Sequence, residues 1–307
     1  MTEQKQPRTL AITLNWRQPE VTLKCIRALL AMEQPELDIL VIDNGSGDDS
    51  VDKLKQSELP FELLSLEKNV GFAAGNNRGL RLALERGYDF SLLINNDAVA
   101  APDMLQKLLA ESSGDIGLLS PKIYFESDPQ RIWFAGGRRD PRTLDVLDTG
   151  HGQFDGLQFS ASRDVDYLVG TCLLVNMAAV RVIGFLDERY FFYFEDLDWS
   201  LRFVEAGYRL RLVADAHLYH QVAVSTGGEY DTALRRYYLA RGGVVFWGSH
   251  IHLGNTPIIV GFRLLSAVKM IGRLAITGKW AVAGAYMRGL RDGWKDTKRP
   301  ASGRPQE

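Results

Sequence analysis

The sequence is poor in cysteine, and its two cysteines, Cys25 and Cys172, lie far apart in apolar runs. Two such thiols cannot form a disulfide framework, and their spacing is not that of a metal site. We therefore expect buried, reduced thiols. Runs of ~20 uninterrupted apolar residues are also missing, so no membrane-spanning helix is expected. The polar segment before residue 9 does not have the pattern of a secretory signal, and the expected location is the cytoplasm.

Two phosphate-binding signatures are absent as well. The sequence contains neither the GxGxxG fingerprint of dinucleotide-binding folds nor the phosphate loop GxxxxGK[ST]. NAD and ATP are therefore not expected as ligands. The hydrophobic fraction of 46% and the charged fraction of 24% are those of an ordinary globular protein.

Short apolar runs alternate with amphipathic stretches in the first part of the chain. Strands are predicted at residues 9–14, 37–42, 61–66 and 90–94. Helices are predicted between and after them, at residues 20–31, 51–56, 73–85 and 102–110. Near-continuous apolar strands separated by helices are typical of a parallel sheet that helices cover on both faces. The predicted fold class is therefore α/β, with a mostly parallel sheet flanked by helices.

The rest of the chain is less regular at first and helical at its end. After an irregular section at 116–166, the pattern predicts a strand at 167–175, a helix at 195–206, a strand at 209–213, and helices from 230 to about 294 with a break near 250–257. We expect one large domain over residues 1–230 and a C-terminal helical appendage over residues 231–307.

The C-terminal appendage differs from the rest in charge. From Pro257 onward there are ten basic and three acidic residues, a net charge of +7, which leaves −9 for the remainder of the chain. The basic residues alternate with apolar ones, a pattern that suits an anionic membrane surface. A helical cap with solvated Lys and Arg explains the same pattern, and both interpretations stay open.

Polar residues follow each of the first four predicted strands. They are Asn15, the run Asp43-Asn44-Gly45-Ser46, the run Asn69-Val70-Gly71, and the run Asn95-Asn96-Asp97. In open α/β sheets ligands bind beyond the carboxyl ends of the strands, so these loops are expected to converge on one cleft. A single loop of this kind would be an ordinary turn, but four at equivalent positions indicate a binding site.

The chemistry of these loops suits a nucleotide diphosphate with a divalent metal ion. Asp43, at a strand end, can accept hydrogen bonds from a base or a ribose. Asp97 follows a rigid apolar strand, and a carboxylate with Asn neighbours suits a hard ion that bridges two phosphates. The simpler interpretation of Asp97 is a residue at the start of the helix that follows Pro102.

Three carboxylates lie within four residues in the segment YFFYFEDLDWSLR at 190–202. Plain helix capping is the simplest explanation, because acids in a first turn are favoured by the helix dipole. Asp198 and Arg202 can form an i, i+4 ion pair, whereas Asp196 projects to another side without a basic partner. A carboxylate desolvated by aromatic neighbours is a candidate general base. Spacing favours Asp196 but does not separate it from Glu195.

Two histidines, His217 and His220, flank a short strand-like piece. A lone histidine is more often structural than a ligand. His220 precedes a Ser-Thr-Gly-Gly stretch that resembles a loop bordering a site. Spacing alone leaves its role as a metal ligand open.

Taken in order, these motifs resemble the family-2 glycosyltransferases with a GT-A fold, particularly the rhamnosyltransferase-like branch of bacterial polysaccharide assembly. The resemblance extends from about Thr9 to Tyr238, so residues 1–230 would be the catalytic domain. It rests on TLNW at 13–16, VIDNGSGDDS at 41–50, NVGFAAGNNRGL at 69–80, LLINNDAVA at 92–100, GTCLLV at 170–175 and YFEDLDWSLRF at 193–203.

The resemblance implies a role for each matching residue. The residues that would hold the nucleotide part of the donor are Thr13, Asn15, Asp43, Asn69, Gly71, Asn76 and Asn77. Asn95, Asn96 and Asp97 stand where the family's DxD motif binds metal and diphosphate, and His220 matches a histidine that can join Mg²⁺ or Mn²⁺. Asp196 matches the catalytic base, and Glu195 its acidic neighbour near the acceptor. Asn95 departs from the family's Asp, which predicts weaker metal binding.

The implied activity is inverting transfer of a sugar, with L-rhamnose as the first candidate, from a UDP- or dTDP-sugar to a saccharide or lipid-linked saccharide acceptor. Nucleic acid is not an expected partner, and a homo-oligomer stays open. A sugar-phosphate nucleotidyltransferase is an alternative, but the loop after the first strand lacks the glycines of that class. A non-catalytic scaffold of polysaccharide assembly is the second alternative, and the retained acidic motifs argue against it.

Overall fold

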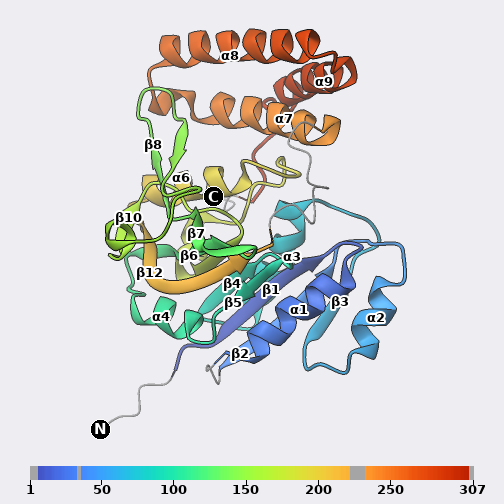
Figure 1. Ribbon diagram of the computed structural model, residues 1–307, viewed down its shortest axis with the longest axis vertical. Coiled ribbons are helices and arrows are strands. Elements are labelled where there is room, and N and C mark those ends of the chain that lie inside the picture. The colour runs from blue at the N-terminus through green and yellow to red at the C-terminus, as the bar shows by residue number, and fades with distance from the viewer. Residues whose placement is uncertain (1–5, 33–35, 222–231, 304–307) are drawn as a thin grey trace.

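The computed structural model describes residues 6–32, 36–221 and 232–303. A large mixed sheet runs through its lower part, and three long helices form a layer at the other end (Figure 1). The strands of the sheet are β1 (Thr9–Asn15), β2 (Leu37–Asp43), β3 (Glu62–Ser65), β4 (Phe90–Ile94), β5 (Ala98–Ala100), β6 (Ile116–Phe125), β7 (Asp128–Phe134), β10 (Arg163–Val165), β11 (Cys172–Asn176) and β12 (Arg209–His220). A separate hairpin consists of β8 (Gly137–Arg139) and β9 (Val146–Asp148).

The helices are distributed between the sheet and the C-terminal layer. They are α1 (Pro19–Leu30), α2 (Ser50–Gln56), α3 (Phe72–Glu85), α4 (Met104–Ala110), α5 (Met177–Ile183), α6 (Glu195–Glu205), α7 (Ala233–His250), α8 (Thr256–Ile276) and α9 (Trp280–Asp296). The eight elements predicted before residue 111 lie within two residues of these bounds. The predicted α/β architecture with a C-terminal helical appendage is therefore confirmed.

Four neighbouring parallel strands carry the loops of interest. The sheet order is β10-β12-β6-β11-β4-β1-β2-β3, and β4, β1, β2 and β3 all run in the same direction. Asn15 and Asp43 are paired in register, so these two strands end side by side. The carboxyl ends of β1, β2, β3 and β4 therefore lie along one edge.

Helices α1 and α3 cover opposite faces of β1. Alternate residues of a strand point to opposite faces, and Thr13 lies against Cys25 of α1. On the other face a Cβ at Gly79 of α3 would meet Ile12 at 2.8 Å, so glycine permits this close approach. Both cysteines are buried and free, as predicted.

Two predictions of strand bounds were wrong. The strand predicted to begin at Tyr167 begins at Cys172, because side chains of α6 take hydrogen bonds from the backbone at Leu168 and Gly170. The strand predicted at 209–213 continues to His220, since it pairs with β6 and then with β5. The helical end also has a second break, at Gly278, whose φ of 71° is left-handed.

A second hydrophobic core joins the helical layer to the large domain. Leu144 at the tip of the β8–β9 hairpin, Leu197 of α6, Phe246 of α7 and Ile259 of α8 pack together there. Helix α9 packs chiefly on α7. Among the helices of the described residues, none is long and apolar enough to cross a membrane.

Candidate active site

A cavity of about 590 Å³ opens where β1 and β4 end. Asparagine side chains from successive strand ends form one wall, and aromatic side chains from the 191–193 segment and α7 form another. The residues that line it are Leu14, Trp16, Gln18, Asn44, Asn69, Gly71, Phe72, Asn76, Ile94, Asn95, Asn96, Phe191, Phe192, Tyr193, Thr232, Leu234, Arg235 and Tyr238. The structure thus brings together loops that follow four different strands.

A network of buried polar side chains lies beneath the asparagine wall. The Asn15 amide donates to a carboxylate oxygen of Asp43 at 2.8 Å, and the Ser46 hydroxyl donates to the same oxygen at 2.5 Å. Thr22 donates to Asn15, and Asn96 donates to Thr22 at 3.0 Å. Asn15 and Asp43 are therefore engaged in positioning the strand ends.

Thr13 lies still deeper. Its side chain is fully buried, and it is not among the residues that line the cavity. Of the residues assigned to the nucleotide from the sequence, Asn69, Gly71 and Asn76 do line it. Asn77 points away, and its amide exchanges hydrogen bonds with the backbone of Leu186.

The loop before α3 is shaped by Asn44 and Gly71. The Asn44 side chain donates to the Gly71 carbonyl and accepts from the Val70 amide, which fixes this loop against the end of β2. Gly71 has φ 90°, and a Cβ there would approach the Phe191 carbonyl oxygen to 2.5 Å. Only glycine allows the loop and the 191–193 segment to meet so closely.

Asp97 and His220 are the candidate metal-binding pair, and neither is among the residues that line the cavity. Antiparallel pairing of β5 with β12 brings them together, and His220 Nε2 lies 3.1 Å from Asp97 Oδ1 with both side chains buried. At this distance the two side chains are hydrogen-bonded to each other, and they would supply one ring nitrogen and one carboxylate oxygen to a divalent ion. No third His, Cys, Asp or Glu completes a metal cluster within the described residues, and the remaining ligands would be phosphate and water.

Asp196, in the first turn of α6, does not line the cavity itself but lies next to Gly170, behind the lining residue Phe72. One carboxylate oxygen accepts from the Gly170 amide at 2.8 Å and from the Tyr167 hydroxyl at 2.9 Å. A Cβ placed at Gly170 would contact both Asp196 and Phe72, which lines the cavity. The next residue, Thr171, accepts a hydrogen bond from the Asn95 amide, so a short stretch of backbone separates Asp196 from the asparagines.

The electrostatic surroundings of Asp196 suit a base. Burial raises the pKa of Asp196 above its ordinary value, although the hydrogen bonds from Gly170 and Tyr167 oppose that rise. Glu195 is 5% exposed, and its Oε2 has no hydrogen-bond partner among the described residues. Burial, and then the neighbouring Asp196 carboxylate, hold the pKa of Glu195 well above its usual range.

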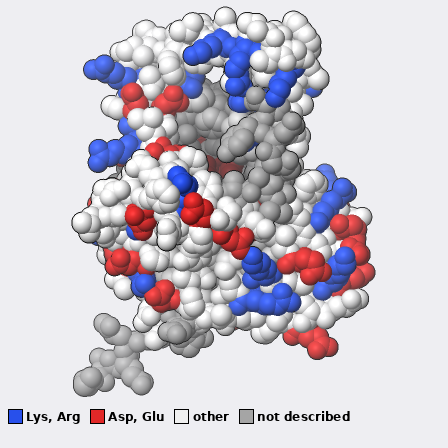
Figure 2. Space-filling model, viewed as in Figure 1, with Lys and Arg blue, Asp and Glu red and all other residues white. Residues whose placement is uncertain are grey.

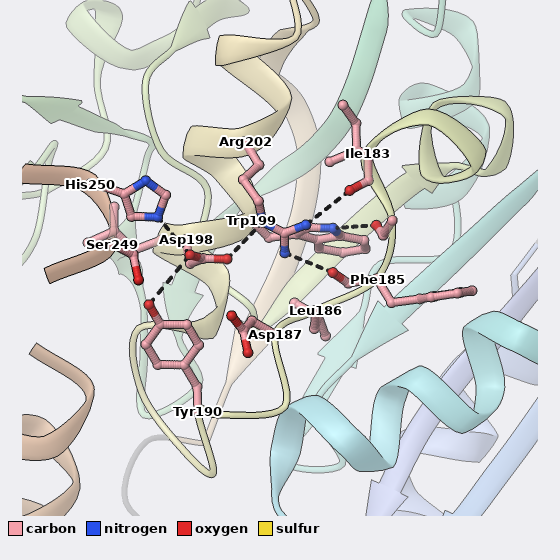
Figure 3. Close-up of polar contacts among 12 residues, drawn as sticks. Ile183, Phe185, Leu186, Asp187, Tyr190, Asp198, Trp199, Arg202, Ser249 and His250 are labelled. Atoms are coloured by element: carbon pink, nitrogen blue, oxygen red, sulfur yellow. Dashed lines mark hydrogen bonds and ion pairs between the residues drawn. The ribbon is translucent and has the colours of Figure 1, made fainter. Parts of the chain in front are cut away.

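Asp198 belongs to a different environment, on the side of α6 that faces α7 (Figure 3). The predicted i, i+4 ion pair is present, with Arg202 Nε 2.8 Å from Asp198 Oδ2. The other carboxylate oxygen lies 2.7 Å from His250 Nε2 and accepts from the Tyr190 hydroxyl at 3.4 Å. Burial acts to raise the pKa of Asp198, but Arg202 and His250 outweigh it and hold the pKa at about 2.

The guanidinium of Arg202 continues this network into the chain that precedes α6. It donates to the carbonyl oxygens of Ile183 at 3.1 Å and Phe185 at 2.8 Å, as Figure 3 shows. Asp198 and Arg202 therefore anchor the first turn of α6, while Asp196, two residues before Asp198, is bonded to Tyr167 and Gly170 of another segment.

Sequence reasoning missed the aromatic wall and the contribution of α7. Phe191 stacks on Tyr238 with ring centroids 4.9 Å apart and an angle of 11° between the planes. The Phe72 amide donates to the Phe191 carbonyl at 2.7 Å, which attaches this segment to α3. The available signal was the run of five aromatic residues at 190–194, directly before the acidic cluster. No feature of the nearby sequence linked this run to α7.

The fold is that of the GT-A glycosyltransferases. The solved structure of the mannosyltransferase PcManGT from Pyrobaculum calidifontis, in complex with GDP-Man and Mn²⁺, has a TM-score of 0.56 and 13% sequence identity, and covers 96% of this chain and 88% of that one. At this identity the likeness concerns the fold alone.

Two curated relatives are rhamnosyltransferases. The chain is 30% identical over 222 residues to the N-acetylglucosaminyl-diphospho-decaprenol L-rhamnosyltransferase of Mycobacterium tuberculosis, covering 64% of this chain and 70% of the relative. It is 22% identical over 248 residues to the dTDP-rhamnosyl transferase RfbF of Shigella flexneri, covering 78% of this chain and 80% of the relative.

The family profile described as "Glycosyl transferase family 2" matches residues 11–184. The chain belongs to this family and is a nucleotide-sugar-dependent glycosyltransferase. The profile ends before α6, so the helix that carries Asp196 and the entire helical layer lie outside the matched part.

Proposed function

We propose that this enzyme transfers L-rhamnose from dTDP-L-rhamnose, with inversion at the anomeric carbon, to a lipid-linked saccharide in the synthesis of a bacterial surface polysaccharide. The observation that carries the proposal is the position of Asp196, a half-buried carboxylate with a raised pKa beside a cavity lined by Asn95 and Asn96. The names of the two rhamnosyltransferase relatives support the choice of sugar and, for the mycobacterial one, of a lipid-linked acceptor.

The donor is proposed to occupy the cavity with its nucleotide near the 69–71 loop and its diphosphate near Asn95 and Asn96. Asn44, Asn69 and Asn76 line this cavity. The Asn44 amide is engaged by Gly71 and Val70, whereas Asn69 Nδ2 and Asn76 Oδ1 make no hydrogen bond with the described residues and can bond to a base or a ribose. Asp43 and Asn15 support this part of the site from below through the buried network.

The proposed chemistry is a single displacement with Asp196 as general base. The acceptor hydroxyl oxygen forms a bond to the anomeric carbon while the bond from that carbon to the diphosphate oxygen breaks, and the hydroxyl proton passes to Asp196. The hydrogen bonds from Gly170 and Tyr167 hold one carboxylate oxygen in a fixed orientation. The raised pKa of Asp196 brings it closer to the operating pH, which makes the carboxylate a stronger base.

A divalent ion bound by Asp97 and His220 would neutralise charge on the leaving diphosphate. The donor set supports this, because one carboxylate oxygen and one ring nitrogen lie side by side, both buried. Asn95 and Asn96 supply neutral amides at the same strand end.

The proposed lipid-linked acceptor agrees with an apolar face of α8 that no other part of the described chain covers. Ile258, Leu265, Val268 and Ile276 recur at helical spacing and are 42%, 68%, 68% and 89% exposed. The α8 sequence has no acidic residue, and Lys269 lies beside this face. Figure 2 shows Lys and Arg gathered on the helical layer next to a broad surface of neither charge. We propose that this face contacts an anionic membrane from one side.

The direct test is transfer by purified full-length protein, with dTDP-L-rhamnose, other dTDP-sugars and UDP-sugars offered to a polyprenyl-diphosphate-linked N-acetylglucosamine acceptor. The expected result is rhamnosylated acceptor and free dTDP, with an inverted anomeric configuration by NMR. Transfer of another sugar would reject the donor, and product with the donor's anomeric configuration would reject the direct displacement.

A further inference from the structure

Helix α7 contributes a positively charged side chain to the donor cavity. Among the described residues that line the cavity, Arg235 in the first turn of α7 is the only charged one. All the others are amide, hydroxyl, aromatic or aliphatic side chains, or glycine. The cavity wall therefore has one cation and no carboxylate within the described part of the chain.

Arg235 lies in a part of α7 that aromatic contacts attach to the cavity rim. Tyr238, one turn further along α7, stacks on Phe191, and the Phe191 carbonyl accepts from the Phe72 amide of α3. The Arg235 guanidinium carbon lies 5.9 Å from the centre of the Tyr193 ring. This is within the range at which a cation is attracted to the face of an aromatic ring. Helix α7 is thus attached to the nucleotide side of the cavity, and Arg235 lies at that junction.

The donor chemistry calls for such a group. A nucleoside diphosphate carries two or more negative charges, and charge on its outer phosphate increases as the bond to the sugar breaks. Asn95 leaves one carboxylate fewer for metal binding than the family's Asp would supply, so an ion is held by fewer charges at that strand end. A guanidinium presents a planar fork of donors that matches phosphate oxygens and keeps its charge at every physiological pH.

We propose that Arg235 binds the diphosphate of the nucleotide-sugar donor, so that the C-terminal helical layer completes a site that the family-matched residues 11–184 do not complete alone. This inference rests on the proposed function, since it takes the cavity to be the donor site. It goes beyond that function by giving a helix outside the matched region a direct part in donor binding.

The chain offers a matched control one residue away. Arg236 has the same charge and a similar, partial burial, but it is not among the cavity-lining residues and faces α9. There, burial raises the pKa of Tyr286 and the Arg236 charge opposes that rise, which marks the two side chains as neighbours. Arg235→Ala and Arg236→Ala therefore remove the same charge from the same helix on two different sides.

The experiment measures the affinity of dTDP and UDP for the wild type, Arg235→Ala, Arg235→Lys and Arg236→Ala by calorimetry at several salt concentrations. Loss of a charge-assisted hydrogen-bonded contact predicts at least about tenfold weaker binding for Arg235→Ala. Arg236→Ala should bind within about twofold of the wild type, and Arg235→Lys should recover part of the loss. The dependence of affinity on salt should become shallower only in Arg235→Ala, because one cation–anion contact is gone.

The outcomes separate the two proposals. If Arg235→Ala binds the diphosphates as tightly as the wild type does, the inference about Arg235 is wrong while the donor site stands. Equal losses in both variants likewise overturn it, because they would report a structural effect on α7. If the wild type binds neither dTDP nor UDP, the proposed function fails first, and the inference fails with it.

Discussion

Glu195, Asp196 and Asp198 are neighbours in the first turn of α6, and each side chain meets different surroundings. Asp196 accepts three hydrogen bonds, two of them from Tyr167 and Gly170 of another segment. Glu195 is buried with an oxygen that has no described partner, and Asp198 is held between Arg202 and His250. Local sequence could predict the Asp198–Arg202 pair, because both partners lie on one helix. It could not separate Asp196 from Glu195, since the groups that distinguish them, Tyr167 and Gly170, come from another segment.

At Asp196 we predict a loss of chemistry without a loss of donor binding. Asp196→Asn keeps the size of the side chain but cannot accept the acceptor's proton, and a positioned base contributes about 10²–10⁴ in rate. The expected result is a kcat at least about 100-fold lower, with dTDP affinity by calorimetry unchanged. Wild-type turnover in Asp196→Asn would remove this residue from the role of base.

The dependence of the wild-type kcat on pH should report the ionisation of Asp196. A general base acts in its deprotonated form, so kcat should fall as the pH decreases through the pKa of Asp196. Since burial raises that pKa, the acidic limb should lie above the ordinary aspartate value of ~3.9. Asp196→Asn should lack this limb.

At Glu195 we predict that removal of the carboxylate stabilises the fold at neutral pH. The pKa of Glu195 is higher in the folded state than in the unfolded state. Folding therefore gains its full stability from protonated Glu195 below the unfolded-state pKa of ~4.3, and this contribution is lost as the pH rises through the folded-state pKa. Glu195→Gln escapes this loss. Its thermal midpoint should exceed that of the wild type at pH 7 by about 2–4 °C for each kcal/mol gained, and the difference should vanish near pH 4.

Equal midpoints of Glu195→Gln and wild type across this pH range would show that the glutamate is not buried in its charged form. Rhamnosyl transfer by the same variant tests whether Glu195 also serves the acceptor, a role that the family resemblance implies. The two measurements are independent, because the stability difference does not require a substrate.

At the scale of elements, α6 depends on α7 for its anchoring. His250, the last residue of α7, lies 2.7 Å from Asp198 through Nε2 and 3.9 Å from Glu205 through Nδ1. Both carboxylates belong to α6 and lie two helical turns apart on one face. The imidazole thus links the end of α7 to the helix that carries the base (Figure 3).

We predict that His250→Ala lowers both stability and turnover. Asp198 keeps Arg202 but loses a buried hydrogen-bond partner, a change that costs about 1–3 kcal/mol. The first turn of α6 is then held less firmly, so kcat should fall while the KM for the donor changes little. His250→Gln, whose amide can donate from nearly the position of Nε2, should recover part of kcat.

The control for His250 is Asp296→Asn. Asp296 is also buried and pairs with Arg241 of α7 at 2.6 Å, but on the side of α7 that faces α9. It should lose stability without the selective loss of kcat. A drop in kcat of the same size in Asp296→Asn would show that turnover follows general stability, and the link through His250 would be rejected.

Which elements could be predicted from the sequence depends on how local their determinants are. The strands and helices before residue 111 follow from hydrophobic periodicity, because each buries a stripe or face that the pattern records. The sequence pattern predicts a strand at residues 167–171, but these residues do not form one. The side chains of Asp196 and Ser200 accept hydrogen bonds from backbone amides of this segment, which would otherwise pair with a neighbouring strand. The aromatic wall could not be predicted either, because Phe191 and Tyr238 are brought together only by the packing of α7.

At the scale of the whole molecule, charge is divided between the two ends. The segment from Pro257 onward has a net charge of +7 and the remainder has −9, so an anionic surface attracts the helical layer and repels the large domain. On α8 the apolar face points away from the core of the protein. Helix α7 lies between α8 and the large domain in Figure 1, so binding through this face would place the strand ends that line the cavity on the far side of α7 from the membrane.

We therefore predict binding to vesicles that contain phosphatidylglycerol, and weaker binding to vesicles of phosphatidylcholine alone. Replacing Leu265 and Val268 together by Glu places two charges in the apolar face and should reduce the partition coefficient at least about tenfold in a sedimentation assay. Lys269→Glu should weaken binding to anionic vesicles only, and added salt should reduce that part of the affinity.

Leu157→Glu serves as the matched control, because Leu157 is 92% exposed on a short turn in the large domain, away from α8. Each Glu adds one negative charge at an exposed apolar position, so a general effect of net charge would appear in Leu157→Glu too. If Leu157→Glu lowers vesicle binding as much as the α8 variants do, the α8 face is not the contact surface. If the α8 variants lose vesicle binding but transfer rhamnose to a short, water-soluble acceptor at the wild-type rate, the membrane contact delivers the lipid-linked substrate and takes no part in the chemistry.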